Sequence, residues 1–317
     1  MANKKICLVT GGAGFIGSHI AENLLKKGFR VRIIDNFSAG KMKNIKNFVN
    51  KIKLIRGDIR NEKALAKALK NVSYVYHEAA IRSVPKSMDD PLPSNSVNAE
   101  GTLKVLVASK KAGVKLVTYA SSSSAYGDGK VFPQYEELKP RPLSPYAVSK
   151  LAGEHYCQTF AKSFNLPTIS LRYFNVYGPR QDPESIYSAV IPRFMELYMD
   201  KKPFEIHWDG KQERDFSYIE DVVNANLLAL KAPSKAYGET FNIAGGKTYS
   251  ILDIVYFLER LAGKKLPKKF SPMRAGDVRK TCANISKARR LLGFNPKARF
   301  NEGLMECWKY FKAGGNK

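Results

Sequence analysis

The feature that most constrains this chain is a run of glycines directly after a short apolar segment near the N-terminus. Residues 6–10 are predicted to form a buried strand, the run GGAGFIG follows, and a helix is predicted over Ser18–Lys27. A strand, a glycine turn and a helix in this order are typical of dinucleotide-binding folds. Gly11 permits the tight turn, Gly14 lets the backbone approach a pyrophosphate, and Gly17 lets the helix pack on the strand. The spacing is G-x-x-G-x-x-G rather than G-x-G-x-x-G.

An acidic residue after the second predicted strand indicates which dinucleotide binds. The strand Arg30–Ile34 ends in Asp35, about 20 residues beyond the glycines. A carboxylate there can accept hydrogen bonds from both ribose hydroxyls and would repel a 2′-phosphate. The sequence therefore predicts NAD rather than NADP.

Strands and helices then alternate along the first half of the chain. Further strands are predicted at 53–57, 74–77, 114–120 and 168–172, with helices at 62–69, 99–112 and 146–164. This alternation indicates βαβ units and a doubly wound parallel sheet, an α/β fold of the Rossmann type. We expect an NAD-binding domain over residues 1–174 and a smaller α/β substrate lobe over 175–317. Elements near 215–243 are expected to pack back on the first domain.

Composition argues against several other classes of protein. The net charge is +25, but the lysines are spread over predicted helix surfaces without a basic tail, so nucleic-acid binding is not expected. No apolar run has the length of a membrane span, and the charged start argues against a signal peptide. The four cysteines have neither metal-ligand nor disulfide spacing. We expect a cytoplasmic protein without a metal or a membrane partner.

The candidate chemistry lies between residues 121 and 150. Tyr146 and Lys150 are four apart on a predicted helix and share one face. A free tyrosine has a pKa of about 10, and a nearby ammonium favours the phenolate. The serine run 121–124 lies at the carboxyl end of a strand, where a hydroxyl could bridge the phenol to a substrate oxygen. His77 is expected to be packed and hydrogen-bonded rather than catalytic.

Taken together, these motifs resemble the extended short-chain dehydrogenase/reductase family over essentially the whole chain. More narrowly, the chain is similar to the UDP-glucose/UDP-N-acetylglucosamine 4-epimerases in TGGAGFIGS (10–18), SSSSAYG (121–127), LSPYAVSK (143–150), LRYFNVYGPR (171–180) and RDF (214–216). The resemblance implies that Tyr146 takes the proton of the sugar 4-hydroxyl while C4 gives its hydride to NAD+. The 4-keto sugar would rotate and take the hydride back on its other face. Lys150 would lower the pKa of Tyr146, with Ser122 or Ser123 as the catalytic hydroxyl.

The resemblance also implies contacts along a whole cleft. Cofactor contacts are expected from Gly11, Gly14, Phe15, Ile16, Gly17, Asp35, Asn36, Ser38, Gly40, Asp58, Ile59, Ala79, Ala80, Arg82, Asn98, Ser121, Tyr146, Lys150 and Tyr173. Substrate contacts are expected from Ser83, Val84, Ser122, Tyr146, Asn175, Phe204, Ile206, Arg214, Arg274, Asp277 and Thr281. Within the second set, the arginines would bind the pyrophosphate of a UDP group bidentately, and the aspartate its ribose.

Departures from related enzymes narrow the substrate. Ser123 and Ser124 stand where similar dehydratases and decarboxylases carry acidic residues, and Asn175 stands where uronate epimerases usually carry Thr. The small Thr281 matches a position where a bulky residue excludes N-acetylated sugars. UDP-GlcNAc and UDP-GalNAc are therefore favoured, together with UDP-Glc and UDP-Gal. Trp208 replaces a usual Gly and either alters the uracil side of the pocket or simply packs on the lobe.

Several alternatives stay open at this stage. The same fold hosts other NAD-dependent nucleotide-sugar enzymes, such as uronate 4-epimerases, decarboxylases and dehydratases, so the fold alone does not choose among them. An NAD-binding regulatory protein on this scaffold would belong to another class, although such proteins tend to lose the Tyr or the Lys. A homodimer is implied by the resemblance, through helices near 91–112 and 149–164.

Overall fold

Seven parallel strands form the central sheet of the molecule. In the computed structural model, residues 5–182, 190–273 and 278–315 are described. The strand order is β11-β6-β5-β4-β1-β2-β3, and every neighbouring pair is parallel. This arrangement confirms the doubly wound α/β fold. The strands are β1 (Ile6–Thr10), β2 (Arg30–Asp35), β3 (Ile52–Arg56), β4 (Tyr74–His77), β5 (Leu116–Ser122), β6 (Thr168–Tyr173) and β11 (Thr240–Ile243).

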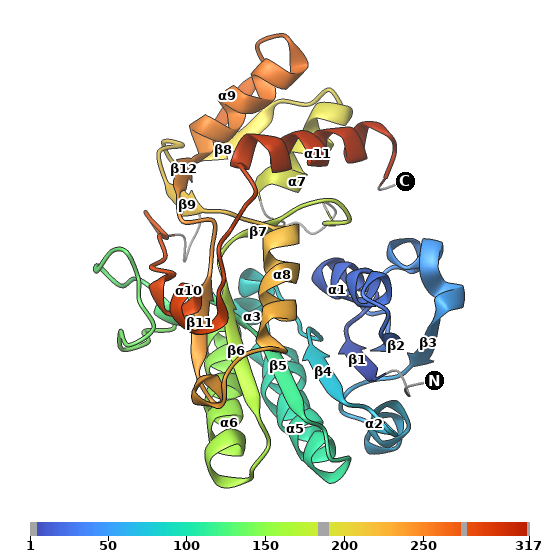
Figure 1. Cartoon of the computed structure of the whole chain (residues 1–317). Coiled ribbons are helices and arrows are strands. Elements are labelled where there is room, and N and C mark those ends of the chain that lie inside the picture. Colours follow the sequence, from blue (N-terminus) through green and yellow to red (C-terminus); the bar gives the residue numbers. More distant parts are fainter. Residues whose placement is uncertain (1–4, 183–189, 274–277, 316–317) are drawn as a thin grey trace.

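Helices cover both faces of this sheet (Figure 1). On one face, helix α5 (Gly101–Lys111) contacts both α2 (Glu62–Leu69) and α6 (Pro145–Ser163). Helices α1 (Phe15–Lys26) and α8 (Ile219–Ala229) contact each other on the other face. Strand β6 is buried along its whole length, as expected for a parallel strand covered on both sides. The short helices α3 (Val84–Asp89) and α4 (Pro91–Ser94) precede α5.

Local sequence signals explain where the catalytic helix begins. The Ser144 hydroxyl accepts a hydrogen bond from the Ala147 N–H at 3.2 Å, and Pro145 occupies the first helical position. Serine at the N-cap followed by proline is a strong start signal, because both suit the unpaired amides of a first turn. Helix α6 therefore begins one residue before Tyr146, at the carboxyl edge of the sheet.

The second half of the chain forms a lobe with little sheet. Its strands make three two-stranded sheets: β7 (Val176–Tyr177) with β10 (Ser217–Tyr218), β9 (Glu213–Asp215) with β12 (Thr248–Ser250), and β8 (Phe204–His207) with β13 (Lys268–Ser271). Its helices are α7 (Val190–Met199), α9 (Ile251–Ala262), α10 (Ser286–Leu292) and α11 (Phe300–Lys312). Aromatic rings fill its interior, with the Phe300 ring centroid 4.2 Å from that of Tyr249 and 5.3 Å from that of Tyr177.

Part of the second half belongs structurally to the first. Strand β11 pairs with β6 in the central sheet, helix α8 packs on α1, and helix α10 contacts β11. The chain therefore returns to the sheet after making the first strands of the lobe, and the lobe stands over the carboxyl edge of the sheet (Figure 1).

Smaller expectations can be compared directly with this fold. His77 is buried and bonded to the hydroxyls of Thr10 at 2.7 Å and Thr102 at 2.9 Å, so its structural role is confirmed. All four cysteines are free thiols. Among the described residues, no helix combines the length and apolarity needed to cross a membrane. The same residues contain no group of three or more His, Cys, Asp or Glu side chains placed to hold a metal ion.

Candidate active site

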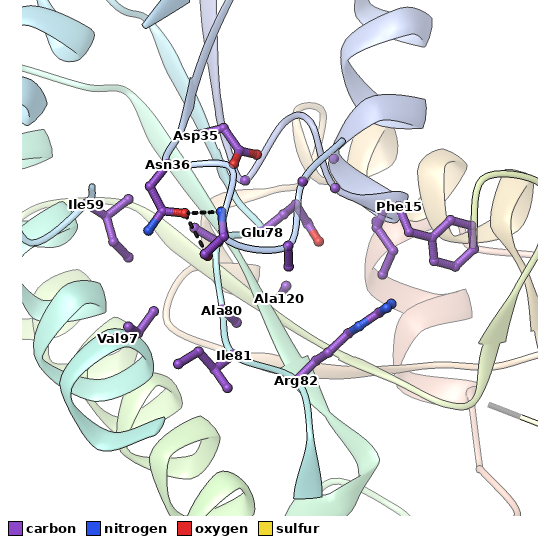
Figure 2. A pocket seen from close by; sticks show the side chains of 18 of the residues that line it. Phe15, Asp35, Asn36, Ile59, Glu78, Ala80, Ile81, Arg82, Val97 and Ala120 are labelled. Carbon is purple, nitrogen blue, oxygen red and sulfur yellow. Dashed lines mark hydrogen bonds between the residues drawn. The ribbon is translucent and has the colours of Figure 1, made fainter. Parts of the chain in front are cut away.

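One elongated pocket follows the carboxyl ends of the sheet strands, where ligands bind in open α/β folds (Figure 2). The glycine turn after β1, the loop after β2 and the segment after β4 border it, and β5 and α6 contribute to its lining. Every predicted cofactor residue except Asn98 lines it, namely Gly11, Gly14, Phe15, Ile16, Gly17, Asp35, Asn36, Ser38, Gly40, Asp58, Ile59, Ala79, Ala80, Arg82, Ser121, Tyr146, Lys150 and Tyr173.

The turn between β1 and α1 has no room for side chains. Gly11 has a φ of +65°, and a Cβ there would lie 2.8 Å from backbone atoms of Ala79. A Cβ at Gly17 would lie 2.4 Å from the carbonyl oxygen of Gly11. Helix α1 starts directly after Gly14, so its unpaired N-terminal amides open onto the turn. A backbone cradle at a helix N-terminus fits the pyrophosphate of a dinucleotide.

Asp35 organises the loop at the predicted ribose end of the pocket. Its carboxylate accepts hydrogen bonds from the backbone N–H groups of Ala13 and Phe37, each at 2.8 Å. Burial raises the pKa of Asp35, and these two hydrogen bonds oppose the rise. Each oxygen still has a lone pair for a ribose hydroxyl, since a carboxylate offers about four acceptor sites. A 2′-phosphate would meet this carboxylate, so the loop fits NAD.

A polar network continues from the ribose end along the next loop. Asn36 donates to Asp58 at 3.0 Å, and Arg60 donates to the same carboxylate through Nε at 2.9 Å and Nη2 at 2.8 Å. The Arg60 guanidinium holds the pKa of Asp58 well below its usual range. The Asp58 carboxylate is therefore committed to this pair, and the buried Ile59 supplies an apolar neighbour in the pocket.

Tyr146 meets one serine of the run. Burial raises the pKa of the Tyr146 phenol, and a hydrogen bond with Ser122 and the positive charge of Arg82 oppose that rise. Ser122 ends β5 and caps the following turn, where its hydroxyl also accepts a hydrogen bond from the Ser124 hydroxyl at 2.9 Å. Of the two candidate hydroxyls, the one bonded to the phenol is that of Ser122 and not that of Ser123.

Lys150 lies one helical turn beyond Tyr146 and is buried. Its Nζ donates to the carbonyl oxygen of Ala120 at 2.8 Å and lies 5.2 Å from the ring centroid of Tyr119. Burial lowers the pKa of Lys150 to about 8, against the opposing charges of Glu78 and Glu154. The ammonium is thus held by the end of β5, and the groups that favour the Tyr146 phenolate here are Ser122 and Arg82. The expectation that Lys150 lowers the pKa of Tyr146 stays a prediction.

A buried ion pair between Glu154 and Arg172 is bonded to the first serine of the run. Glu154, one turn after Lys150, accepts from Arg172 through Nε at 2.7 Å and Nη2 at 2.6 Å, and it also accepts from the Ser121 hydroxyl. The Arg172 guanidinium lies 4.7 Å from the ring centroid of Tyr126, in the turn that follows the run. Charged groups this deeply buried persist only when paired, and this pair ties β5, β6 and α6 together.

Comparison with known proteins identifies the family. The model of the NAD dependent epimerase/dehydratase family matches residues 7–244. The chain belongs to this family. An uncharacterized UDP-glucose epimerase of Bacillus subtilis is 38% identical over 308 residues, which cover 94% of this chain and 95% of the relative. A UDP-glucuronate 4-epimerase of Thermodesulfobacterium geofontis is 38% identical over 321 residues, covering 96% and 95%.

A solved structure supports the same grouping. The UDP-N-acetylglucosamine 4-epimerase of Methanobrevibacter ruminantium, in complex with UDP-N-acetylmuramic acid, superposes with a TM-score of 0.93 at 37% identity, covering 98% of this chain and 99% of that one. Within the family, the chain therefore groups with UDP-sugar 4-epimerases, which are isomerases. The family depends on NAD, and NAD is the cofactor that this pocket takes.

Several of the predicted substrate residues lie on the lobe side. The Asn175 amide donates to the Thr281 hydroxyl at 3.0 Å and to the Asp215 carbonyl at 2.8 Å, so two of the predicted residues meet. Arg214 lies next to them on β9. Ser83 caps α3, its hydroxyl accepting from the Lys86 N–H at 3.2 Å, and Val84 begins that helix. Arg274 and Asp277 lie outside the described residues.

Three expected contacts are corrected by burial. Asn98 lies behind the pocket, where its amide bonds to both backbone groups of Ile81 and to the Ser149 hydroxyl. The side chains of Phe204 and Ile206 are in the hydrophobic core, and the Phe204 ring stacks on Phe194 at 4.6 Å. Both residues alternate with outward-facing neighbours on β8, so only their backbone could meet a uracil.

Other pocket residues were missed by sequence reasoning. Lys41 and Asp182 form an ion pair at 3.0 Å at the pocket margin, although 141 positions separate them. Glu78 also lines the pocket and accepts a hydrogen bond from the Tyr173 hydroxyl at 2.9 Å. No local pattern marks such pairs, because the partners come together only when the sheet forms.

Trp208 has a φ of +62° and lies 4.6 Å from the Arg279 guanidinium, so packing on the lobe accounts for its position.

Proposed function

We propose that this chain interconverts UDP-GlcNAc and UDP-GalNAc, and UDP-Glc and UDP-Gal, by inverting C4 of the sugar. The observation that carries the proposal is the Tyr146 phenol, hydrogen-bonded to Ser122 and one helical turn from Lys150, on the wall of an NAD pocket. This is the arrangement of a general base with a bridging hydroxyl. The similarity to UDP-sugar 4-epimerases supports the same reaction.

Each residue has a distinct task in this proposal. When bound, NAD+ would accept the hydride from C4, and the reduced cofactor would return it. Tyr146 removes the O4 proton, directly or through the Ser122 hydroxyl, and returns it when the configuration has inverted. Arg82 adds positive charge that favours the phenolate. Lys150 keeps a positive charge under the phenol and orients the cofactor ribose.

Thr281 and Asn175 bear on which sugars fit the substrate pocket. The Thr281 hydroxyl is bonded to the Asn175 amide, so a small side chain with satisfied polar atoms borders the lobe side. Such a wall leaves room for an acetamido group, whereas a bulky ring there would not. Arg214, together with Arg274 and Asp277, is proposed to hold the UDP group.

Product analysis tests this function. The purified protein is incubated with NAD+ and, separately, with UDP-GlcNAc, UDP-Glc and UDP-glucuronate, and the C4 epimers are resolved by chromatography and NMR. We expect conversion of both hexoses, with the N-acetylated sugar used at least as well. Conversion of the uronate alone would instead assign the chain to the uronate 4-epimerases, and release of carbon dioxide or water would indicate a decarboxylase or dehydratase. NAD binding without any conversion would favour a regulatory protein.

The oligomeric state is proposed from the same resemblance. Met88, Leu92 and Val148 are 61%, 75% and 51% exposed on α3, α4 and α6. These apolar side chains suit a homodimer in which the neighbouring helices of two copies pack together. Light scattering at several protein concentrations measures the mass directly, and a concentration-independent monomer would contradict the dimer.

A further inference from the structure

Three neighbouring strand ends bring a carboxylate close to the catalytic lysine. Glu78 directly follows β4, Ala120 lies near the end of β5, and Tyr173 ends β6, with β5 between the other two. The Tyr173 hydroxyl donates to Glu78 at 2.9 Å, while Lys150 donates to the Ala120 carbonyl at 2.8 Å. The bond between Glu78 and Tyr173 therefore spans the strand end that receives the ammonium. Glu78, Ala120, Lys150 and Tyr173 all line the same pocket, and Figure 2 labels the first two of them.

The hydrogen bonds around Tyr173 fix the direction of its proton. Asn226 donates its amide N–H to the Tyr173 oxygen at 2.8 Å, and the same amide also donates to the Val222 carbonyl at 2.9 Å. An amide nitrogen is only a donor, so the phenol oxygen accepts from Asn226 and gives its own proton to Glu78. The carboxylate is thereby held in one orientation toward the pocket.

The charges that face Lys150 come from two carboxylates. Glu154 is committed to Arg172 by two hydrogen bonds, which balance its charge, and Glu78 has no such guanidinium among its described partners. The other titratable groups that face the two are Tyr146, Tyr173, Cys157, Tyr119 and His77. Burial raises the pKa of the phenols and of the thiol and lowers that of His77, so burial favours the neutral form of each group. Glu78 is thus the carboxylate left to balance Lys150.

We propose that Glu78 is a positioning residue for the epimerisation: its carboxylate, oriented by Tyr173, is the counter-charge that keeps Lys150 protonated at the floor of the pocket. The inference rests on the proposed function, in which the charge of Lys150 supports the Tyr146 phenolate. Burial raises the pKa of Glu78 to about 7 and lowers that of Lys150 to about 8, and each charge opposes the shift of the other. The two groups therefore titrate as a coupled pair close to neutral pH.

The variant Glu78→Gln separates charge from shape. The amide has the size of the carboxyl group and still accepts the hydrogen bond of Tyr173, but it carries no charge. Lys150 then loses its proton more easily, so we expect the alkaline limb of kcat/KM to move to lower pH by about one unit. A role limited to structure would lower the rate by the same factor at every pH. Glu136→Gln is a matched control, because Glu136 is a half-buried glutamate that accepts from the Asn242 backbone at 2.8 Å, away from the pocket.

A second measurement does not depend on turnover. Infrared difference spectra between mildly acidic and mildly alkaline pH report the ionisation of buried carboxyl groups. Burial raises the pKa of both Glu78 and Asp215 to about 7, so we expect two carboxyl bands to change near pH 7. Glu78→Gln should remove the Glu78 band and leave that of Asp215. In Lys150→Met the Glu78 transition should move to higher pH, because the carboxylate has lost its counter-charge.

The outcomes separate the two proposals. An alkaline limb that stays in place in Glu78→Gln, or a Glu78 transition that ignores Lys150→Met, would overturn the positioning role even if the wild-type protein converts UDP-sugars. If the wild-type protein converts none of them, the proposed function fails, and the infrared experiment still decides whether Glu78 and Lys150 are coupled. Circular dichroism and thermal melting of each variant establish that it is folded.

Discussion

The two halves of the molecule build their interiors differently. The first half is organised by one parallel sheet, and it holds buried polar pairs such as Glu154 with Arg172 and His77 with two threonines. The lobe has three two-stranded sheets, and rings around Phe300 fill its interior. Long parallel strands align their carboxyl ends at one edge, so they can hold several polar groups at fixed distances. Aromatic packing is less directional and suits a cover over that edge.

This difference between the halves places the reacting groups in the first half and the aromatic packing in the lobe. In the first half, the reacting groups lie near strand ends. Hydrogen bonds to the backbone, such as that from Lys150 to Ala120, hold them in position. In the lobe, only a few polar contacts, such as that from Asn175 to Thr281, face the predicted substrate side. Removing a reacting group should therefore alter the rate alone, whereas removing a ring should alter stability alone. Four substitutions test this separation.

Tyr146→Phe should have the largest effect. Loss of the hydroxyl removes the proposed base, and general acid–base groups contribute about 10²- to 10⁴-fold to rate. NAD affinity and the melting temperature should stay close to wild-type values, because the ring still packs in place. Steady-state assays and NAD titration measure both quantities. Tyr256→Phe on α9, where the side chain is 53% exposed, is the control; retention of full activity by Tyr146→Phe would reject the assignment.

Arg172→Met should give the largest loss of stability. It leaves Glu154 buried without its cation, which typically costs about 3–5 kcal/mol. Urea denaturation measures the free energy of unfolding. The double variant Arg172→Met with Glu154→Gln should recover much of that loss, since no buried charge is left unpaired. A single variant as stable as wild type would show that the pair does not organise the first half.

Phe300→Leu should have a moderate effect on stability. The ring contacts Tyr177, Phe216, Tyr249 and Phe257, and replacing it by a smaller apolar group should cost about 1–3 kcal/mol. NAD affinity should be unchanged, because the pocket lies on the sheet. Phe270→Leu is the matched control, with a side chain 57% exposed on β13. A loss of NAD binding free energy as large as the loss of unfolding free energy would show that lobe packing and cofactor binding are not independent.

Trp208→Gly should have the smallest effect. A φ of +62° strains any residue with a Cβ by roughly 1–2 kcal/mol, and glycine removes that strain. The stack on Arg279 is lost at the same time, which is worth about 0.5–1 kcal/mol at an exposed site. The free energy of unfolding should therefore change by no more than about 1 kcal/mol. A large change in KM for the UDP-sugar with unchanged stability would instead place Trp208 on the uracil side.

Much of the first half could be predicted because its signals are local. The predicted strands at residues 6–10 and 74–77 and the predicted helix at 62–69 coincide with β1, β4 and α2. Apolar runs, glycine turns and N-cap residues act within a few positions, so they can be read in order along the chain. The lobe strands were mostly missed, because β7 and β10 are two residues each and pair across 41 positions.

The amino-acid sequence alone identified the family, the cofactor and many of the residues that line the dinucleotide pocket, because these depend on short motifs in a set order. Only the tertiary structure decided that Ser122 rather than Ser123 meets the phenol, that Asn98 and Phe204 are buried away from the pocket, and that Glu78 lies opposite Lys150. Glu78 and Tyr173 are 95 positions apart and meet only because β4 and β6 flank the same strand. Strand order and burial are properties of the whole chain, and no single segment encodes them.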